Sequence, residues 1–330
     1  MKTVKLKFVG KWDGMKPEDN IICFWLKRYG YDVQITDDAD YIVCDILGSD
    51  YYEYCGYPQV RIFECGENYV PDFNLVDYAI CRYPIQFGDR NFYLPGCTSP
   101  GEYWHNLANK DRNYPEEFLK EKIYFANLVT SHDSEHNARS IFFEKLSAYK
   151  RVESAGSCMN NMPNGETVNW LDESKSNFQR QSKFTICFES TSHAGFITEK
   201  ITDAFFSDTI PIYLGSPNIT EIFNPDAFIN VTDYESFDAV IEKIKELDQD
   251  DEKYLQMLRQ PILKDPTLPA RMHQELGEFI NHIFEQPLEQ AYRRCRVYYP
   301  KWHDEYLTRA IEPTRGYQLK QKVKKLLKRQ

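Results

Sequence analysis

The sequence predicts an α/β fold with two Rossmann-like domains facing a central cleft. Two observations lead to this prediction. Short apolar runs alternate with helical patterns over most of the chain, which is typical of a parallel α/β architecture. The length of 330 residues also exceeds the usual size of a single domain, about 100–200 residues. We expect a first domain over residues 1–118, a second over 119–300 and a tail over 301–330.

Apolar runs in the first domain predict five strands and one helix. Ile22, Trp25 and Leu26 form one apolar stripe at helical spacing, and Gly30 ends that helix. The polar stretch 98–121 is expected to connect the domains. The predicted strands are 4–9, 33–35, 41–44, 59–63 and 78–81, and the predicted helix is 18–28.

The second domain continues the alternation of strands and helices. Its apolar runs are short enough for buried strands, and its helical patterns keep one apolar face. The predicted strands are 123–129, 184–188, 210–214 and 228–231, and the predicted helices are 135–149, 198–206, 237–247 and 252–258.

Composition and charge exclude some classes of protein. The net charge is −10, which argues against nucleic acid as a partner because a phosphate backbone requires a basic face. None of the nine cysteines forms a CxxC pair, and several lie in apolar runs, which favours a reducing compartment. Residues 1–12 lack the apolar core of a signal peptide, and no apolar run is long enough to span a membrane. We therefore expect a cytoplasmic protein.

Residues 184–217 contain the pattern that indicates a ligand. A buried strand ends at Glu189, and a polar loop leads to a helix that begins near Thr198. Ligands of open α/β sheets bind beyond the carboxyl ends of strands, and a helix N-terminus attracts anions. A pyrophosphate suits this place, with Lys200 adding positive charge and Glu199 accepting hydrogen bonds from ribose hydroxyls. A solvated helix start is the alternative that spacing alone allows.

This segment resembles the nucleotide-binding motif of the α-1,3/1,4-fucosyltransferases. That family shows a strand ending in Phe-Glu-Asn, an aromatic residue shortly before Thr-Glu-Lys, and then an apolar helix. The resemblance implies donor-binding roles for Glu189, Ser190, Phe196, Glu199 and Lys200. Ser190 stands where Asn is usual and Phe196 where Tyr is common, so hydrogen-bonding reach is shortened at the first position and removed at the second.

A second match is Cys65-Gly66-Glu67-Asn68, which follows the predicted strand 59–63. It resembles the family's Gly-Glu-Asn segment, in which the Glu is the proposed general base. A carboxylate at the end of a strand can take a proton from a sugar hydroxyl as its oxygen attacks. Without the resemblance, Glu67 would be interpreted as a solvated loop acid.

A third match is Asn137-Ala138-Arg139-Ser140, at the start of the predicted helix 135–149. It resembles the family's helix whose Arg contacts the pyrophosphate. A guanidinium suits this role because its planar fork binds phosphate oxygens in pairs and keeps its charge. By spacing alone, Arg139 would be an ordinary surface arginine.

The three matches together imply an inverting glycosyltransferase of the GT-B type. The first domain would bind the glycan acceptor and the second GDP-fucose, so that L-fucose moves to a GlcNAc hydroxyl of an N-acetyllactosamine-type glycan in α-1,3 linkage. Glu67 would deprotonate that hydroxyl, while Arg139 and Lys200 stabilise the departing GDP. No cofactor is expected to be required, although a divalent metal could stimulate the reaction. No HExxH-type pairing of histidines indicates a bound metal.

Two alternatives to this function stay open. One is a GT-B transferase that uses another nucleotide sugar, and the other is a non-catalytic sugar-binding paralogue.

The C-terminal residues 315–330 carry seven basic side chains and no acidic one. Leu319, Val323, Leu326 and Leu327 fall on one helical face. The pattern predicts a basic amphipathic helix that makes peripheral contact with an anionic membrane, which would be the inner face for a cytoplasmic protein. A solvated or disordered tail is the alternative.

Overall fold

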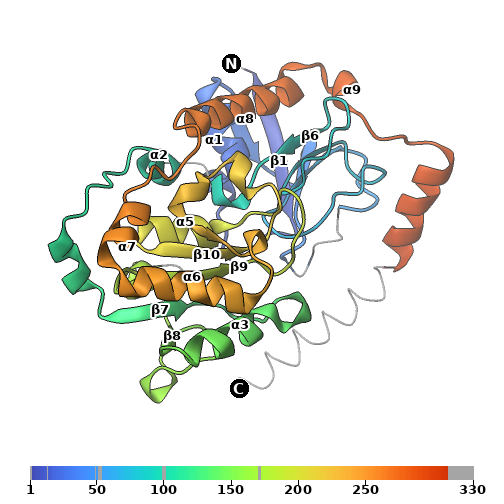
Figure 1. Ribbon diagram of the computed structural model, residues 1–330. Coiled ribbons are helices and arrows are strands. Elements are labelled where there is room, and N and C mark those ends of the chain that lie inside the picture. Colours follow the sequence, from blue (N-terminus) through green and yellow to red (C-terminus); the bar gives the residue numbers. More distant parts are fainter. Residues whose placement is uncertain are drawn as a thin grey trace, which may run out of the picture. The chain divides into compact units, whose positions relative to one another are not determined.

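The computed structural model describes residues 2–12, 14–48, 50, 54–98, 102–169 and 172–310. The chain divides into two compact units. The N-terminal unit combines Met1–Leu94 with the chain from His273 onward, and the central unit is Pro95–Met272. Each unit contains one sheet with helices packed on it (Figure 1).

The N-terminal unit is built on a parallel sheet of six strands in the order β2-β1-β3-β4-β5-β6. The strands are β1 Thr3–Val9, β2 Asp32–Ile35, β3 Tyr41–Cys44, β4 Val60–Glu64, β5 Tyr78–Cys81 and β6 Asn91–Tyr93. The five predicted strands are confirmed, with β3 and β5 at their predicted bounds, whereas β6 was not predicted. Because β2 and β3 lie on opposite sides of β1, the direction of strand addition reverses between β1 and β3.

Two helices cover one face of this sheet, α1 (Ile21–Arg28) and α8 (Leu268–Glu285). The predicted stripe of Ile22, Trp25 and Leu26 is buried there. A Cβ on Gly277 of α8 would approach the Trp25 ring to 2.7 Å, so a glycine lets α8 pack this closely. The apolar side chains of α8 on this face are Leu276, Ile280, Ile283 and Phe284.

The segment after α8 is tied to the sheet by buried charge. It includes α9 (Leu288–Ala291) and a helical stretch over 298–310. Asp77 is fully enclosed; its carboxylate forms an ion pair with Arg294 and accepts hydrogen bonds from the backbone N–H groups of Arg293 (2.8 Å) and Arg294 (2.9 Å). Arg61, exposed by only 1%, pairs with Asp304 at 2.8 Å.

The central unit repeats the same strand order on a different sequence. Its parallel sheet runs β11-β10-β9-β7-β8, so β8 and β9 flank β7 as β2 and β3 flank β1. The strands are β7 Tyr124–Leu128, β8 Val152–Ser154, β9 Ser182–Phe188, β10 Ile210–Leu214 and β11 Ile229–Asn230. The four predicted strands of this region are confirmed, and β8 was not predicted.

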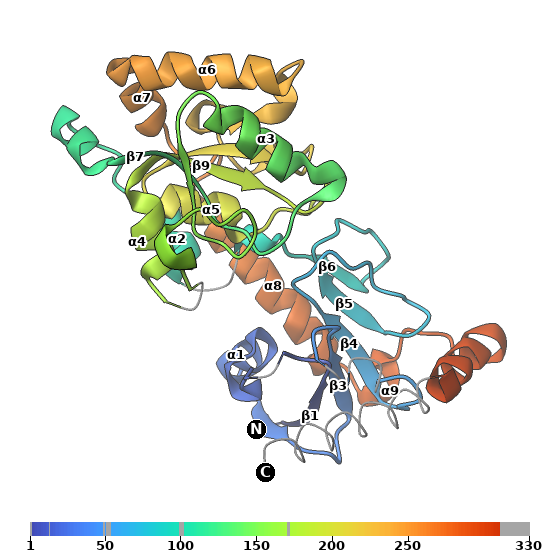
Figure 2. The same cartoon turned by 90° about the horizontal axis from the view of Figure 1, so that it is seen from below.

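Helices cover both faces of the central sheet (Figure 2). One face carries α3 (Ala138–Ser147), α6 (Phe237–Gln249) and α7 (Asp251–Leu258). The other carries α2 (Glu102–Ala108) and α5 (Glu199–Phe206), with α4 (Ser174–Arg180) beside α5. Within the described residues, none of the helices combines the length and the apolar character that crossing a membrane requires.

The division into units differs from the expected boundaries in two places. Residues 95–118 belong to the central unit, because Trp104 and Leu107 pack with Phe205 and Phe223. Residues 273–300 return to the N-terminal unit, because the apolar face of α8 is buried on that sheet. The expected amphipathic helix over 315–330 lies outside the described residues.

The enclosed Asp77 carboxylate provides a test of this arrangement. Replacing Asp77 by Ala leaves the Arg294 guanidinium buried without its counter-ion, which costs about 3–5 kcal/mol of stability. We expect this loss in the free energy of unfolding measured with urea. Asp38→Ala is the control, since Asp38 pairs with Lys5 while its side chain stays 91% exposed. An Asp77→Ala protein as stable as Asp38→Ala would contradict this account of the C-terminal segment.

Candidate functional site

The polar loops of the central unit gather where the strand order reverses. Loops 129–137 and 189–198 follow the neighbouring strands β7 and β9. The Glu135 N–H donates to the Ser190 carbonyl (3.0 Å), and the Thr191 hydroxyl donates to the Glu135 carboxylate (2.9 Å). Such a reversal at the carboxyl edge of a sheet leaves a crevice for ligands. The Glu135–Thr191 pair was not predicted from the sequence, because its members lie 56 positions apart.

Glu189 organises the loop between β9 and α5. The residue is only 3% exposed, and its carboxylate accepts from the Thr198 N–H (2.7 Å) and the Thr198 hydroxyl (2.8 Å). The Lys200 ammonium lies 3.3 Å from the same carboxylate. Thr198 occupies the predicted N-cap position, but its hydroxyl donates to Glu189 instead of capping α5. The first N–H groups of α5 therefore lack a side-chain cap.

Burial and pairing shift the pKa values of Glu189 and Lys200 differently. Burial raises the pKa of Glu189, and the attraction of Lys200 only partly opposes this. Burial also acts to lower the pKa of Lys200, but the nearby Glu189 and Glu199 charges outweigh it, so this pKa is raised. The exposures explain the difference: the Glu189 side chain is fully enclosed, whereas the Lys200 side chain keeps 25% of its surface in solvent. Lys200 is therefore a stable positive charge at the start of α5.

Arg139 reaches the same region from the first turn of α3, but its guanidinium is bound to the main chain. Nε and Nη2 donate to the Phe188 carbonyl at 2.9 and 2.6 Å, and Nη1 donates to the His132 carbonyl at 2.7 Å. Nη1 also donates to the Thr130 hydroxyl at 3.1 Å. Burial lowers the pKa of Arg139, with the charge of Glu189 opposing the shift. In this structure Arg139 fastens the ends of β7 and β9 together, and its contact with pyrophosphate stays a prediction.

The other predicted donor-binding residues differ in exposure. Glu199 and Ser190 are exposed, and Lys200 is half-buried. Phe196 is only 3% exposed, and its N–H donates to the His193 carbonyl at 3.1 Å. The central unit thus brings all six predicted donor-binding residues to the loops after β7 and β9 or to the helices that follow them. Their roles toward a ligand stay predictions.

The predicted base, Glu67, belongs to the N-terminal unit and follows β4 at the carboxyl edge of that sheet. Its side chain is exposed. The loop is held by its backbone, since the Glu67 N–H donates to the Cys65 sulfur (3.4 Å) and the Glu67 carbonyl accepts from the Tyr69 N–H (2.8 Å). An exposed carboxylate is accessible to a substrate hydroxyl, and the role of Glu67 as the base stays a prediction.

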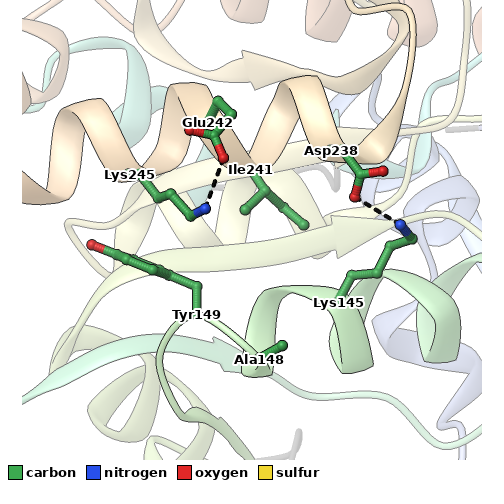
Figure 3. A pocket seen from close by; sticks show the side chains of 7 residues that line it. All are labelled: Lys145, Ala148, Tyr149, Asp238, Ile241, Glu242 and Lys245. Carbon is green, nitrogen blue, oxygen red and sulfur yellow. Dashed lines mark hydrogen bonds and ion pairs between the residues drawn. The ribbon is translucent and has the colours of Figure 1, made fainter.

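A pocket on the central unit lies away from these loops, between α3 and α6 (Figure 3). Its charged side chains pair with one another. Lys145 contacts Asp238 at 2.7 Å, and Lys245 contacts Glu242 at 2.7 Å. Its position over a face of the sheet, and not at the carboxyl edge, separates it from the loops around Glu189.

The described residues contain no group of three or more His, Cys, Asp or Glu side chains that could hold a metal ion. All nine cysteines are free thiols, and seven of them are buried. The expected independence from metal stays a prediction.

The sequence models of two protein-domain families together match most of the chain. Residues 6–98 match the N-terminal domain of the α-(1,3)-fucosyltransferase FucT. Residues 119–260 match the C-terminal domain of glycosyltransferase family 10 (fucosyltransferase). The two matches follow each other in the family's order, and they contain Glu67 and the six predicted donor-binding residues.

Individual relatives agree with this assignment. The chain is 32% identical over 252 residues to the α-(1,3)-fucosyltransferase FucT of Helicobacter pylori, a match that covers 66% of this chain and 50% of that protein. It is 28% identical over 149 residues to the human 4-galactosyl-N-acetylglucosaminide 3-α-L-fucosyltransferase FUT6, covering 44% of this chain and 39% of that protein. The chain thus spans about half or less of the length of these two relatives.

A solved structure extends the similarity to the fold. The crystal structure of an α1,3-fucosyltransferase with GDP-fucose matches with a TM-score of 0.64 and 26% identity, covering 84% of this chain and 91% of that one. Two parallel α/β sheets and this similarity define the GT-B fold of glycosyltransferases, as predicted. Within that class, the chain belongs to glycosyltransferase family 10, the fucosyltransferases.

The enclosed Glu189 predicts a pH dependence of stability. Its folded-state pKa is raised above the ordinary value of 4.5, so its contribution to stability is full below that pH and is lost as pH rises through the folded-state pKa. Glu189→Gln removes this titration. We expect the unfolding free energy of the wild type, relative to Glu189→Gln, to fall as pH rises above 4.5.

Chemical denaturation of both proteins at several pH values measures this difference. Glu144→Gln, on the exposed side of α3, is the matched control and should track the wild type at every pH. If the unfolding free energy of the wild type relative to Glu189→Gln stays constant or rises with pH, burial does not disfavour the ionised form of Glu189.

Proposed function

We propose that this protein transfers L-fucose from GDP-fucose to the 3-hydroxyl of the GlcNAc residue in an N-acetyllactosamine-type glycan, with inversion at the anomeric carbon. The observation that carries the proposal is the arrangement around Glu189. The β7/β9 strand reversal, the start of α5, which Thr198 does not cap, and the charge of Lys200 meet there. Backbone N–H groups and an ammonium are the partners that a pyrophosphate requires.

The reaction is a single displacement. Glu67 accepts the proton of the acceptor hydroxyl as its oxygen forms a bond to the fucose anomeric carbon. The bond from that carbon to the β-phosphate oxygen breaks on the opposite face, and its electron pair leaves with GDP. Lys200 and the N–H groups of α5 stabilise the negative charge that grows on GDP. Arg139 supports this step by fixing the loops that carry those groups.

The relatives of this chain support both substrates. The structure with a TM-score of 0.64 was solved with GDP-fucose. The human relative is named for fucosylating the 3-position of a 4-galactosyl-N-acetylglucosaminide. Because this chain shares the family and the Glu199-Lys200 pair of its motif, we propose the same donor and acceptor for it.

A transferase with another nucleotide sugar and a non-catalytic paralogue are the competing functions. Thermal stabilisation by UDP-sugars but not by GDP or GDP-fucose would favour the first. Binding of GDP-fucose without release of GDP in the presence of any acceptor would favour the second. We propose that no metal is required, so GDP release should persist in EDTA.

Glu67→Gln tests the proposed base. The amide keeps the shape of the side chain but cannot accept the proton, so we expect turnover to fall by about 10²–10⁴-fold. Affinity for GDP-fucose should not change, because Glu67 belongs to the acceptor step. GDP release with N-acetyllactosamine measures turnover, and calorimetry measures donor binding. Glu18→Gln, exposed in the same unit, is the control. Full turnover in Glu67→Gln would assign the base to another group.

Exposed aromatic side chains support the proposed peripheral contact with an anionic membrane. Tyr299, Trp302 and Tyr306 are 79%, 54% and 69% exposed on the helical stretch 298–310. Their spacing places them on one face. Tyr and Trp suit the membrane interface because their rings are apolar and their tips polar. The basic residues of 315–330 follow directly in the sequence and supply attraction to anionic lipid.

Vesicle binding measures this contact. We expect the protein to sediment with vesicles that contain phosphatidylserine, but not with pure phosphatidylcholine, and to be released at high salt. Changing Lys322, Lys325 and Lys328 to Glu should weaken binding by on the order of 100-fold or more, since each juxtamembrane cation contributes about 1 kcal/mol. Equal sedimentation with both lipids would refute an electrostatic membrane contact.

A further inference from the structure

The N-terminal unit has a strand reversal of its own, between β1 and β3. The loops that leave its carboxyl edge start at Gly10 and at Asp45. By the rule that applies to β7 and β9, this is the edge of the sheet at which ligands bind. The first of these loops presents Trp12, whose side chain is 44% exposed. None of the sequence motifs included this residue.

The residue before Trp12 is anchored in the interior of the unit. The Lys11 side chain is only 8% exposed and forms ion pairs with Asp45 (3.2 Å) and with Glu64. Its ammonium also donates to the Glu64 carbonyl at 2.7 Å, and the Asn20 amide donates to the Glu64 carboxylate at 3.1 Å. Burial acts to lower the pKa of Lys11, but the two carboxylates outweigh it and the pKa is raised. Lys11 is therefore charged and fixed at neutral pH.

The backbone on both sides of Trp12 is fixed as well. The Gly10 N–H donates to Asp50 at 3.1 Å, and the Met15 N–H donates to the Trp12 carbonyl at 3.2 Å. Gly14 adopts a φ of +110°, and a Cβ there would approach the indole ring to 2.9 Å. A glycine at this position thus gives the ring a flat backbone surface to lie against. The indole thus lies against Gly14 while nearly half of the residue stays in solvent.

A rigid, exposed indole at a ligand-binding edge fits a sugar ring. Exposing apolar aromatic surface costs about 25 cal/mol per Å², and ordering the side chain in advance reduces the entropy lost on binding. The C–H groups on one face of a galactose ring form an apolar patch, because the axial hydroxyl projects to the other face. An aromatic plane packs against such a patch without competing for its hydroxyls.

The position of Trp12 relative to Glu67 defines which sugar it meets. Trp12 follows β1 and Glu67 follows β4, with β3 between these strands. Neighbouring strands lie about 4.8 Å apart, so the two strand ends are separated by about 10 Å. This separation is comparable to the length of a disaccharide. A GlcNAc beside Glu67 therefore leaves its 4-linked galactose within reach of Trp12.

We propose that Trp12 determines acceptor specificity by stacking its indole on the galactose ring of an N-acetyllactosamine-type acceptor. The inference rests on the proposed function for the identity of the acceptor. Lys11 acts through Trp12 as a positioning residue and does not touch the sugar. Glu67 contacts the GlcNAc hydroxyl, and Trp12 recognises the galactose by contact with its ring.

Kinetics with two acceptors test this division of roles. For Trp12→Ala we expect the KM for N-acetyllactosamine to rise about tenfold, as for the loss of about 1.4 kcal/mol of stacking. The KM for free GlcNAc should stay constant, so the preference for the disaccharide should fall by the same factor. The kcat and the affinity for GDP-fucose should change little. Trp12→Phe keeps an aromatic plane and should restore most of the preference.

Phe24→Ala is the matched control, since Phe24 is also 44% exposed in the same unit but lies on the helix α1. It should leave both KM values unchanged. A rise in both KM values for Trp12→Ala, or a loss of donor affinity or thermal stability, would mean that Trp12 packs within the protein. Unchanged constants for both acceptors would mean that it contacts neither sugar. Each of these results overturns the proposal.

A binding measurement separates this inference from the proposed function. Saturation-transfer NMR with N-acetyllactosamine and GDP should show saturation of the galactose ring protons in the wild type and its loss in Trp12→Ala. That result supports stacking even if no acceptor is turned over, in which case only the proposed catalysis fails. A wild type that turns over the disaccharide without saturating galactose protons refutes the role of Trp12 while the proposed function stands.

Discussion

Strands that run parallel end at the same edge of a sheet, and both units of this chain depend on that constraint. Loops that are far apart in sequence, such as those carrying Glu135 and Thr191, meet only because β7 and β9 are neighbours with a common direction. The reversal of strand order then sends the chain after the two strands to opposite faces of the sheet, and ligands of such sheets bind at this edge. The N-terminal unit repeats the same geometry with Lys11 and Asp45. One topological rule thus provides a binding edge twice, on sequences with no detectable repeat.

The fold was largely predictable because its signals are local. Buried parallel strands such as β3 and β10 are continuous apolar runs, and a helix such as α6 shows its stripe over a few turns. Among the elements that were not predicted, the strands β6 and β8 have weak local signals, since they have only three residues each. The helix α8 was not predicted either, although it has 18 residues. The spacing of Leu276, Ile280 and Ile283 is that of an apolar helical face, but it does not indicate which sheet the face packs on. No local pattern states that residues near the C-terminus complete the first sheet.

The site was predictable in its residue types and less so in its contacts. Motif spacing located Glu189, Lys200 and Arg139, and all three meet at the predicted edge. Their hydrogen bonds could not be predicted, because a guanidinium can donate either to a backbone carbonyl or to a phosphate. Arg139 donates to the Phe188 carbonyl, and Thr198 donates to Glu189 in place of capping its own helix. Buried donors and acceptors must all be paired, and that pairing depends on the whole surroundings.

The N-terminal unit is built from two separate stretches of the chain, and this has a consequence for its biosynthesis. Its six strands leave the ribosome before the central unit, whereas α8 begins only at residue 268. At about 5–20 residues per second, the delay is on the order of ten to forty seconds. Throughout it, the face of Tyr41, Val43 and Ile62 has no α8 to cover it. The central unit, whose chain is continuous, can fold during that time. The first sheet thus stays uncovered on this face until α8 has been synthesised.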